Sequence, residues 1–193
     1  MALTAIILFI LLVLIGRIVF HYKLTGTSGI KVNLKSFSSR SFSLYSVLVT
    51  IGWWGIVLLA VLEFFDMFYS QFNFGLTGII IGWGFVLLGV IITVVAQYQM
   101  GTSWRYIGSM SNETELITHG LFRYCRNPIY LGGLIFFDGV IVLLPHFLTL
   151  LCVILIYIAV EILIRYEEEP HLKKLHGKAY EEYCSKVHRF MFY

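Results

Sequence analysis

The sequence predicts an all-α, polytopic membrane protein with about five transmembrane helices. Three observations support this fold class: the composition, the length of the apolar segments and the placement of the charges. Of the 193 residues, 59% are hydrophobic and only 13% are charged, whereas soluble domains carry about 25% charged residues. Because so few charges cannot cover a water-facing surface, we expect lipid to replace water along much of the chain.

Five apolar segments are the candidates for helices that cross the bilayer. In chain order they are residues 2–20, 44–65, 78–99, 128–144 and 146–164. The first three approach or exceed the roughly 20 residues that span a hydrocarbon core of about 30 Å. The last two are shorter, and only Pro145 and His146 mark the join between them. We therefore expect a tight helical hairpin, with one long broken segment as the alternative.

The basic residues predict the orientation in the membrane. All 14 lysines and arginines lie in or beside the 21–43 and 101–127 loops or in the tail after Ile164. Arg17, near the inner end of the first segment, is expected to extend toward the interface. The N-terminus, the 66–77 loop and the hairpin tip carry none, so the positive-inside rule places the N-terminus outside and the tail in the cytosol. The first segment has no basic stretch before it, which favours an uncleaved helix over a signal peptide.

The chain divides into two unlike parts. Residues 1–99 carry three predicted spans with their loops, and Gly82 and Gly89 in the third span, together with Gly78, predict close helix packing. Residues 100–193 carry a cytosolic loop, the 128–164 hairpin and the tail, and most of the chemically versatile side chains. We expect the tail to continue the fifth span as an amphipathic helix. It would lie on the membrane or fold back as a lid over the loop.

Metal and nucleic-acid partners are not expected. His171 and His176 are five residues apart, so they do not share a helical face as metal-binding histidines do. The three cysteines are odd in number, which argues against disulfides and a zinc site. Asp138 and Glu161 fall within apolar spans, where ionisable groups are costly. Asp138 would be a packing partner or face a cavity, and Glu161 would pair with Arg165 one turn later.

The most informative segment covers residues 118–132. Asn127 is a good helix N-cap and Pro128 a good first helical residue, but capping does not explain why Arg126 and Tyr130 flank this turn. The hairpin brings the turn close to the carboxylates at 167–169. An arginine, an asparagine, a tyrosine and several carboxylates are thus expected to converge at the cytosolic surface, which is typical of a small-molecule site.

These residues also carry a family resemblance across residues 100–190. The pattern runs Gly120, then Arg126-Asn127-Pro128-x-Tyr130-x-Gly132, Glu168-Glu169-x-x-Leu172, Gly177-x-x-Tyr180-x-x-Tyr183 and Val187-x-Arg189. It resembles the signature of the isoprenylcysteine carboxyl methyltransferases, membrane enzymes related to the phospholipid methyltransferases. The chain departs from that signature in having Asn127 where the family usually has histidine and His176 where it usually has an aromatic residue.

The resemblance implies S-adenosylmethionine as cofactor and the carboxylate of a prenylated cysteine as methyl acceptor. The residues that it places at the cofactor are Glu115, Leu116, Ile117, His119, Gly120, Tyr124, Asn127, Pro128, Ile129, Tyr130 and Glu168. An ionised carboxylate needs positioning and desolvation for in-line displacement but no general base. Arg126 would hold it, with Arg165 as a second candidate, and the prenyl chain would approach laterally from the bilayer.

Three alternatives remain open at this stage. A phospholipid or other amine methyltransferase shares the C-terminal pattern and would use a proton acceptor such as Glu167. A nicotinamide-dependent sterol or isoprenoid reductase carries a distantly similar arrangement but typically has more spans. A membrane scaffold without enzymatic activity would have no need for a polar cluster at one surface.

Overall fold

The computed structural model describes residues 1–26, 39–101 and 115–190, and within these ranges it is helical without strands. The first helix is continuous through α1 (Ala2–Phe9), the π-turn η1 (Ile10–Ile15) and α2 (Gly16–Thr25). It is followed by α3 (Arg40–Phe64), α4 (Gly75–Gln99), the short 3₁₀ turn η4 (Gly120–Arg123) and α5 (Pro128–Leu143). A second continuous helix comprises α6 (Phe147–Leu163), the π-turn η5 (Ile164–Glu168) and α7 (Glu169–His176), and α8 (Lys178–Lys186) is the last helix of the described chain.

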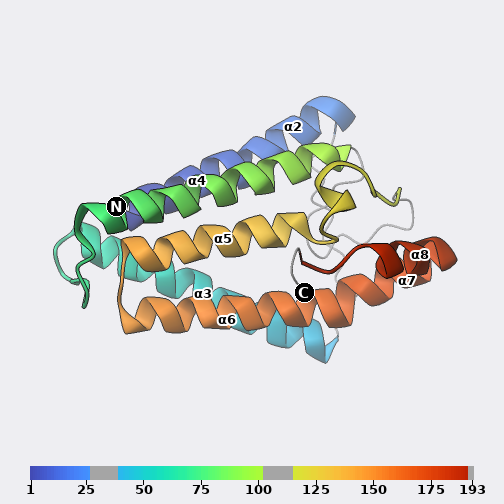
Figure 1. Ribbon diagram of the computed structural model, residues 1–193. Coiled ribbons are helices and arrows are strands. Elements are labelled where there is room, and N and C mark those ends of the chain that lie inside the picture. The colour runs from blue at the N-terminus through green and yellow to red at the C-terminus, as the bar shows by residue number, and fades with distance from the viewer. Residues whose placement is uncertain (27–38, 102–114, 191–193) are drawn as a thin grey trace.

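The all-α membrane fold is confirmed. Among the described residues, four helices are long and apolar enough to cross a bilayer: Ala2–Thr25, Arg40–Phe64, Gly75–Gln99 and Phe147–His176. The fourth predicted span is α5, an apolar helix of 16 residues, about 24 Å at 1.5 Å per residue. It forms the predicted tight hairpin with α6, and all five helices lie side by side (Figure 1).

Glycine contacts hold the α4–α5 pair close. A Cβ atom at Gly89 would lie 2.5 Å from the Gly132 carbonyl oxygen, and one at Gly82 would lie 2.7 Å from the Leu143 side chain. The predicted close packing through Gly82 and Gly89 is therefore confirmed. Gly78 instead lies against Phe74, which directly precedes its own helix.

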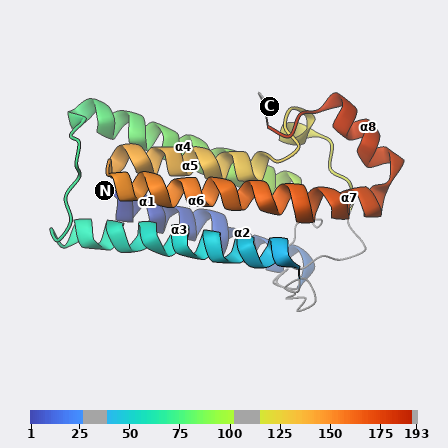
Figure 2. The ribbon, with the colours of Figure 1, turned by 90° about the horizontal axis from the view of Figure 1, so that it is seen from below.

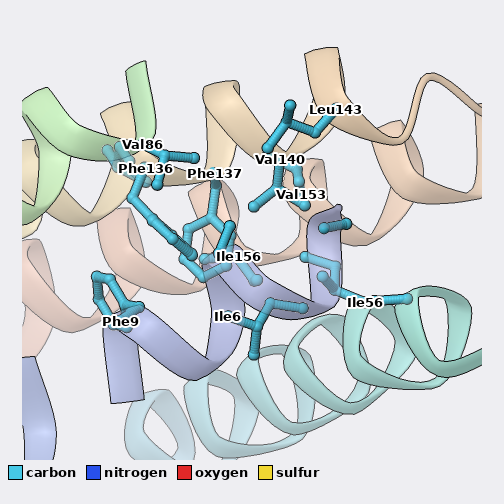
Figure 3. Packing of buried hydrophobic residues seen from close by; sticks show 14 of the residues in the cluster. Ile6, Phe9, Ile56, Val86, Phe136, Phe137, Val140, Leu143, Val153 and Ile156 are labelled. Carbon is cyan, nitrogen blue, oxygen red and sulfur yellow. The ribbon is translucent and has the colours of Figure 1, made fainter. Parts of the chain in front are cut away.

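The helices enclose a large apolar cluster (Figure 3), and a second, smaller cluster joins α3 to α6. The labelled members of the large cluster come from α1, α3, α4, α5 and α6, so each long helix contributes to it. The predicted packing role of Asp138 is supported here, because Tyr157 of α6 donates a hydrogen bond to its carboxylate at 2.9 Å. Arg17 is buried and donates to the Gly101 carbonyl. The Arg17 guanidinium thus joins α2 to the end of α4, and its extension toward the interface stays a prediction.

The tail does not continue as one helix. Gly177 takes a positive φ of 53°, a conformation that residues with a Cβ rarely adopt, and it separates α7 from α8. Helix α8 turns back toward the η4 segment and the start of α5 (Figure 2). The expectation of a single tail helix is thus wrong, and the folded-back alternative describes the arrangement.

Candidate active site

A cavity of about 590 Å³ opens beside the first turn of α5 and extends into the helical bundle. Its polar end is lined by Glu115, Arg126, Asn127, Tyr130, Glu168 and His171. Its inner part is apolar and aromatic, and is lined by Phe9, Val13, Val49, Trp53, Leu134, Phe137, Ile156 and Val160. Pockets of roughly 300–1,000 Å³ with a few polar groups over apolar walls are typical of small-molecule sites.

The structure places most of the predicted cofactor residues at this cavity. Those that line it are Glu115, Leu116, Ile117, Asn127, Pro128, Ile129, Tyr130 and Glu168. His119 and Tyr124 are exposed and do not line it, and Gly120 lies against the side chain of Gln99. Gly120 has a φ of 62°, and a Cβ atom there would lie 2.4 Å from that amide.

The predicted convergence of the Asn127–Pro128 turn with the acidic run is present. The hydroxyl of Tyr130, in the first turn of α5, donates a hydrogen bond to the Glu168 carboxylate at the end of η5. The π-turn determines which carboxylate reaches the cavity, because its wider turn rotates the side chains relative to a regular helix. Glu168 faces the cavity, while Glu167 accepts a hydrogen bond from Ser39, the N-cap of α3.

Of the three predicted catalytic residues, Arg126 alone lines the cavity. Glu167 contacts Ser39 outside it. Arg165 is half exposed and forms the predicted ion pair with Glu161, with 2.5 Å between Nε and Oε2. Arg126 is mostly buried, and its Nη2 lies 3.1 Å from Glu169. Its Nε is buried without a hydrogen-bond partner among the described residues, which leaves a donor for a ligand.

The C-terminal segment 187–190 packs against the turn that begins α5. The backbone N–H of Arg126 donates to the His188 carbonyl at 3.0 Å, and that of Asn127 donates to the Arg189 carbonyl at 3.3 Å. The Asn127 side chain also donates to the Arg189 carbonyl, at 3.4 Å. The expected helix start is confirmed, with Asn127 at the N-cap position and Pro128 following, but the Asn127 side chain does not cap α5.

A chain of ion pairs fixes this segment. Both carboxylate oxygens of Glu169 accept from Arg189, at 2.9 Å from Nε and 2.7 Å from Nη2. The hydrogen bonds to Glu169 raise the pKa of Arg189 above its usual value. Arg189 Nη1 also lies 3.6 Å from Glu161. Arg126, Glu169, Arg189, Glu161 and Arg165 thus form a continuous series of charges of alternating sign.

Two further hydrogen bonds hold the η4 segment beside the cavity. The N–H of Leu121 donates to the Gln99 side chain at the end of α4, at 2.7 Å. The buried Tyr183 hydroxyl of α8 donates to the Phe122 carbonyl at 2.6 Å. Burial raises the pKa of Tyr183, so the hydroxyl stays protonated and remains a donor.

Sequence reasoning missed several residues that line the cavity. Leu172, Tyr180 and Tyr183 belong to the quoted family pattern and could have been proposed from it, whereas Phe42, Tyr45, Trp53, Thr93 and Gln97 lie in spans without a chemical pattern. In the part of the chain that the structure describes, no group of His, Cys, Asp or Glu is arranged to hold a metal ion.

Comparison with known proteins places this site in a family. The family model for phospholipid methyltransferases matches residues 77–179, more than half of the chain. The chain belongs to the phospholipid methyltransferase family. The match begins in α4 and ends in α8, so it covers the α4–α5 pair and most of the polar end of the cavity.

The curated relatives carry a more specific name. A probable protein-S-isoprenylcysteine O-methyltransferase from Oryza sativa subsp. indica is 34% identical over 111 residues, which cover 56% of this chain and 58% of the relative. The protein-S-isoprenylcysteine O-methyltransferase of Schizosaccharomyces pombe is 31% identical over 109 residues, 54% of this chain and 45% of the relative. The chain matches about half the length of these relatives. They confirm the resemblance seen in the sequence.

Proposed function

We propose that the chain is an integral membrane methyltransferase that uses S-adenosylmethionine to methylate the carboxylate of a prenylated cysteine. One observation carries the proposal: a single cavity joins a charged end at the bundle surface to an apolar end inside the bundle. A lipid with a reactive polar head matches both ends, and the names of the relatives supply the acceptor class.

The side chains at the polar end fit the cofactor. When bound, S-adenosylmethionine supplies an electrophilic methyl group on a sulfonium. Carboxylates and aromatic faces favour such a cation, and Glu168, Tyr130 and Tyr45 all line the cavity. The Tyr130–Glu168 hydrogen bond holds the carboxylate in place, so its orientation is set before a ligand binds.

Arg126 is the residue that we assign to the acceptor carboxylate. Its unpartnered Nε provides a charge-assisted donor, while its contact with Glu169 holds the guanidinium in place. The acceptor is already ionised at neutral pH, so the chain has to orient it for in-line attack and exclude water rather than remove a proton. The aromatic and apolar walls of the cavity provide that exclusion.

The acceptor would reach the cavity from the bilayer. Leu14 of the first helix and Trp54 of α3 line the cavity and are also 39% and 63% exposed. The cavity therefore extends to the outer surface of the bundle between these helices. We propose that the prenyl chain enters there, with the polar end of the cavity on the cytosolic side and the N-terminus, at the opposite end of the bundle (Figure 1), outside.

A phospholipid amine is the second candidate acceptor, favoured by the description of the matching family model. Amine methylation releases a proton, and Glu168 is the acidic side chain at the cavity that contacts Tyr130. Glu167, the proton acceptor expected from the sequence, contacts Ser39 instead. The two candidates differ in what Arg126 does: it binds the carboxylate acceptor but repels a protonated amine.

The first test measures binding of S-adenosylhomocysteine to the purified protein by calorimetry, followed by methyl transfer to a prenylcysteine and to phosphatidylethanolamine. We expect micromolar binding that falls at least tenfold in Glu168→Gln and is unchanged in Glu182→Gln, an exposed acid on α8. Arg126→Ala should abolish transfer to the prenylcysteine while binding persists. A folded protein that binds no S-adenosylhomocysteine would refute the proposal, and transfer to the phospholipid alone would select the second acceptor.

A further inference from the structure

Three aromatic rings from three helices close the inner end of the cavity. They are Phe9 of α1, Trp53 of α3 and Phe137 of α5, and all three line it. The ring centroids of Phe9 and Trp53 are 6.2 Å apart, those of Phe9 and Phe137 are 6.5 Å apart, and those of Trp53 and Phe137 are 5.9 Å apart. Each ring therefore contacts the other two, within the range of favourable aromatic pairs.

The residues about one turn beyond these rings belong to the closed core. On each helix we consider the residue one turn farther from the polar end of the cavity. It is Ile6 beside Phe9 on α1, Ile56 beside Trp53 on α3 and Val140 beside Phe137 on α5. All three are buried, and they do not line the cavity. Figure 3 shows them in the packed core. On these three helices the lining of the cavity ends at Phe9, Trp54 and Phe137.

We propose that this ring cluster, Phe9, Trp53 and Phe137, limits the length of the lipid tail that the cavity accepts. The inference rests on the proposed function and adds the residues that determine tail specificity. The cavity follows α5 from Pro128 to Phe137, and nine residues of helix extend about 13 Å. An acceptor whose reacting group lies beside Arg126 therefore has a fixed depth available. A longer tail must displace a ring from its two partners or leave the cavity through the opening between Leu14 and Trp54.

Two changes on α5 alter that depth in opposite directions. Phe137→Ala removes one ring and lengthens the cavity. Gly133, one turn nearer the polar end, also lines the cavity, and a Cβ atom there would meet nothing within 4 Å. Gly133→Leu would thus place a side chain in the open space and shorten the cavity. Phe136→Ala is the matched control, since Phe136 is fully buried and its centroid lies 4.3 Å from that of Phe9, but it does not line the cavity.

The experiment compares kcat/KM for cysteine acceptors that carry geranyl, farnesyl and geranylgeranyl tails. A hydrophobic pocket discriminates by roughly tenfold or more for each methylene that it fails to accommodate. We expect Phe137→Ala to raise the ratio of the longest to the shortest acceptor about tenfold, and Gly133→Leu to lower it by a similar factor. Phe136→Ala should leave the ratio unchanged. Prenylcysteine amides lack the acceptor carboxylate and can only compete with the acceptors for binding. Their inhibition constants should depend on tail length in the same way as kcat/KM in each variant.

The outcomes separate this inference from the proposed function. A wild-type protein that methylates no prenylated acceptor would refute the function. A wild-type protein that is active, with equal tail ratios in Phe137→Ala and Phe136→Ala, would overturn the ring cluster as the limit and place the tail in the side opening between Leu14 and Trp54. Binding of S-adenosylhomocysteine identifies folded variants, and Phe137→Leu replaces Phe137→Ala if the latter does not fold.

Discussion

Removing the Arg189 side chain should release the C-terminal segment from the site. Arg189 makes two charge-assisted hydrogen bonds to Glu169, and the two side chains are only 16% and 20% exposed. Each such bond contributes about 1.5–3 kcal/mol, and the remaining exposure places each at the lower end. Glu169 keeps Arg126 as a partner, so no unpaired buried charge is added. Arg189→Ala should therefore lower the free energy that docks the segment by about 3 kcal/mol. The undocked population should rise roughly 100-fold.

Cys125 reports on this undocking. Its side chain is buried, its thiol lies 3.3 Å from the Arg189 carbonyl oxygen, and burial raises the pKa of the thiol. Because the thiolate is the reactive form, an alkylating reagent modifies Cys125 mainly when the segment has moved away. In a background with Cys152→Ala and Cys184→Ala, Arg189→Ala should raise the alkylation rate of Cys125 by about 100-fold.

Two control variants make the result interpretable. Arg189→Lys retains the charge but cannot form the two parallel bonds, so its rate should fall between those of the wild type and Arg189→Ala. Arg123→Ala removes an exposed cation from the adjacent η4 turn and should leave the rate unchanged. An alkylation rate in folded Arg189→Ala that matches the wild type would show that the ion pair does not hold the segment, and the reasoning would be wrong.

Two stability predictions concern the helix contacts that support the site. Gly89→Ala should destabilise the protein by about 1–3 kcal/mol, the usual range for overpacking, because its Cβ would lie 2.5 Å from the backbone of α5. Gly84→Ala is the control and should be neutral, because a Cβ atom there would meet nothing within 4 Å. Tyr183→Phe should cost about 1–2 kcal/mol by leaving the buried Phe122 carbonyl without its partner, while the exposed Tyr124→Phe should not. Thermal unfolding in a fixed detergent checks both pairs, and equal stability within either pair would contradict the corresponding contact.

The helices and the approximate position of the site could be predicted from the sequence because both depend on local patterns. Apolar length predicts the spans, and the hairpin alone brings Tyr130 close to Glu168, as the hydrogen bond between them shows. The orientation of Glu167 and Glu168 could not be predicted, because the π-turn changes the helical register and a 3.6-residue period does not reveal it. The apolar end of the cavity was also missed, since Trp53 reaches it only through the packing of α3 in the bundle.

The fold back at Gly177 was one of the alternatives that the sequence left open, and it changes how the site is assembled. An amphipathic pattern shows that the tail has one apolar face but not what covers that face. Both the membrane and the cytosolic loop were therefore possible partners for it. In the structure, the tail supplies backbone acceptors to Arg126 and Asn127 and a side chain to Phe122. The second half of the family pattern therefore acts on the first half through direct contacts.

The charge balance of these contacts bears on the choice of acceptor. The series of ion pairs contains three cations, Arg126, Arg165 and Arg189, and two carboxylates, Glu161 and Glu169. One positive charge thus remains uncompensated within the series, and Arg126 is its member that lines the cavity. A carboxylate acceptor supplies the missing negative charge, whereas a protonated amine would add a second positive charge in a partly buried site where like charges repel strongly. Arg126 therefore favours the prenylcysteine carboxylate over the phospholipid amine, while Glu115 and Glu168, which also line the cavity, would face the cationic cofactor.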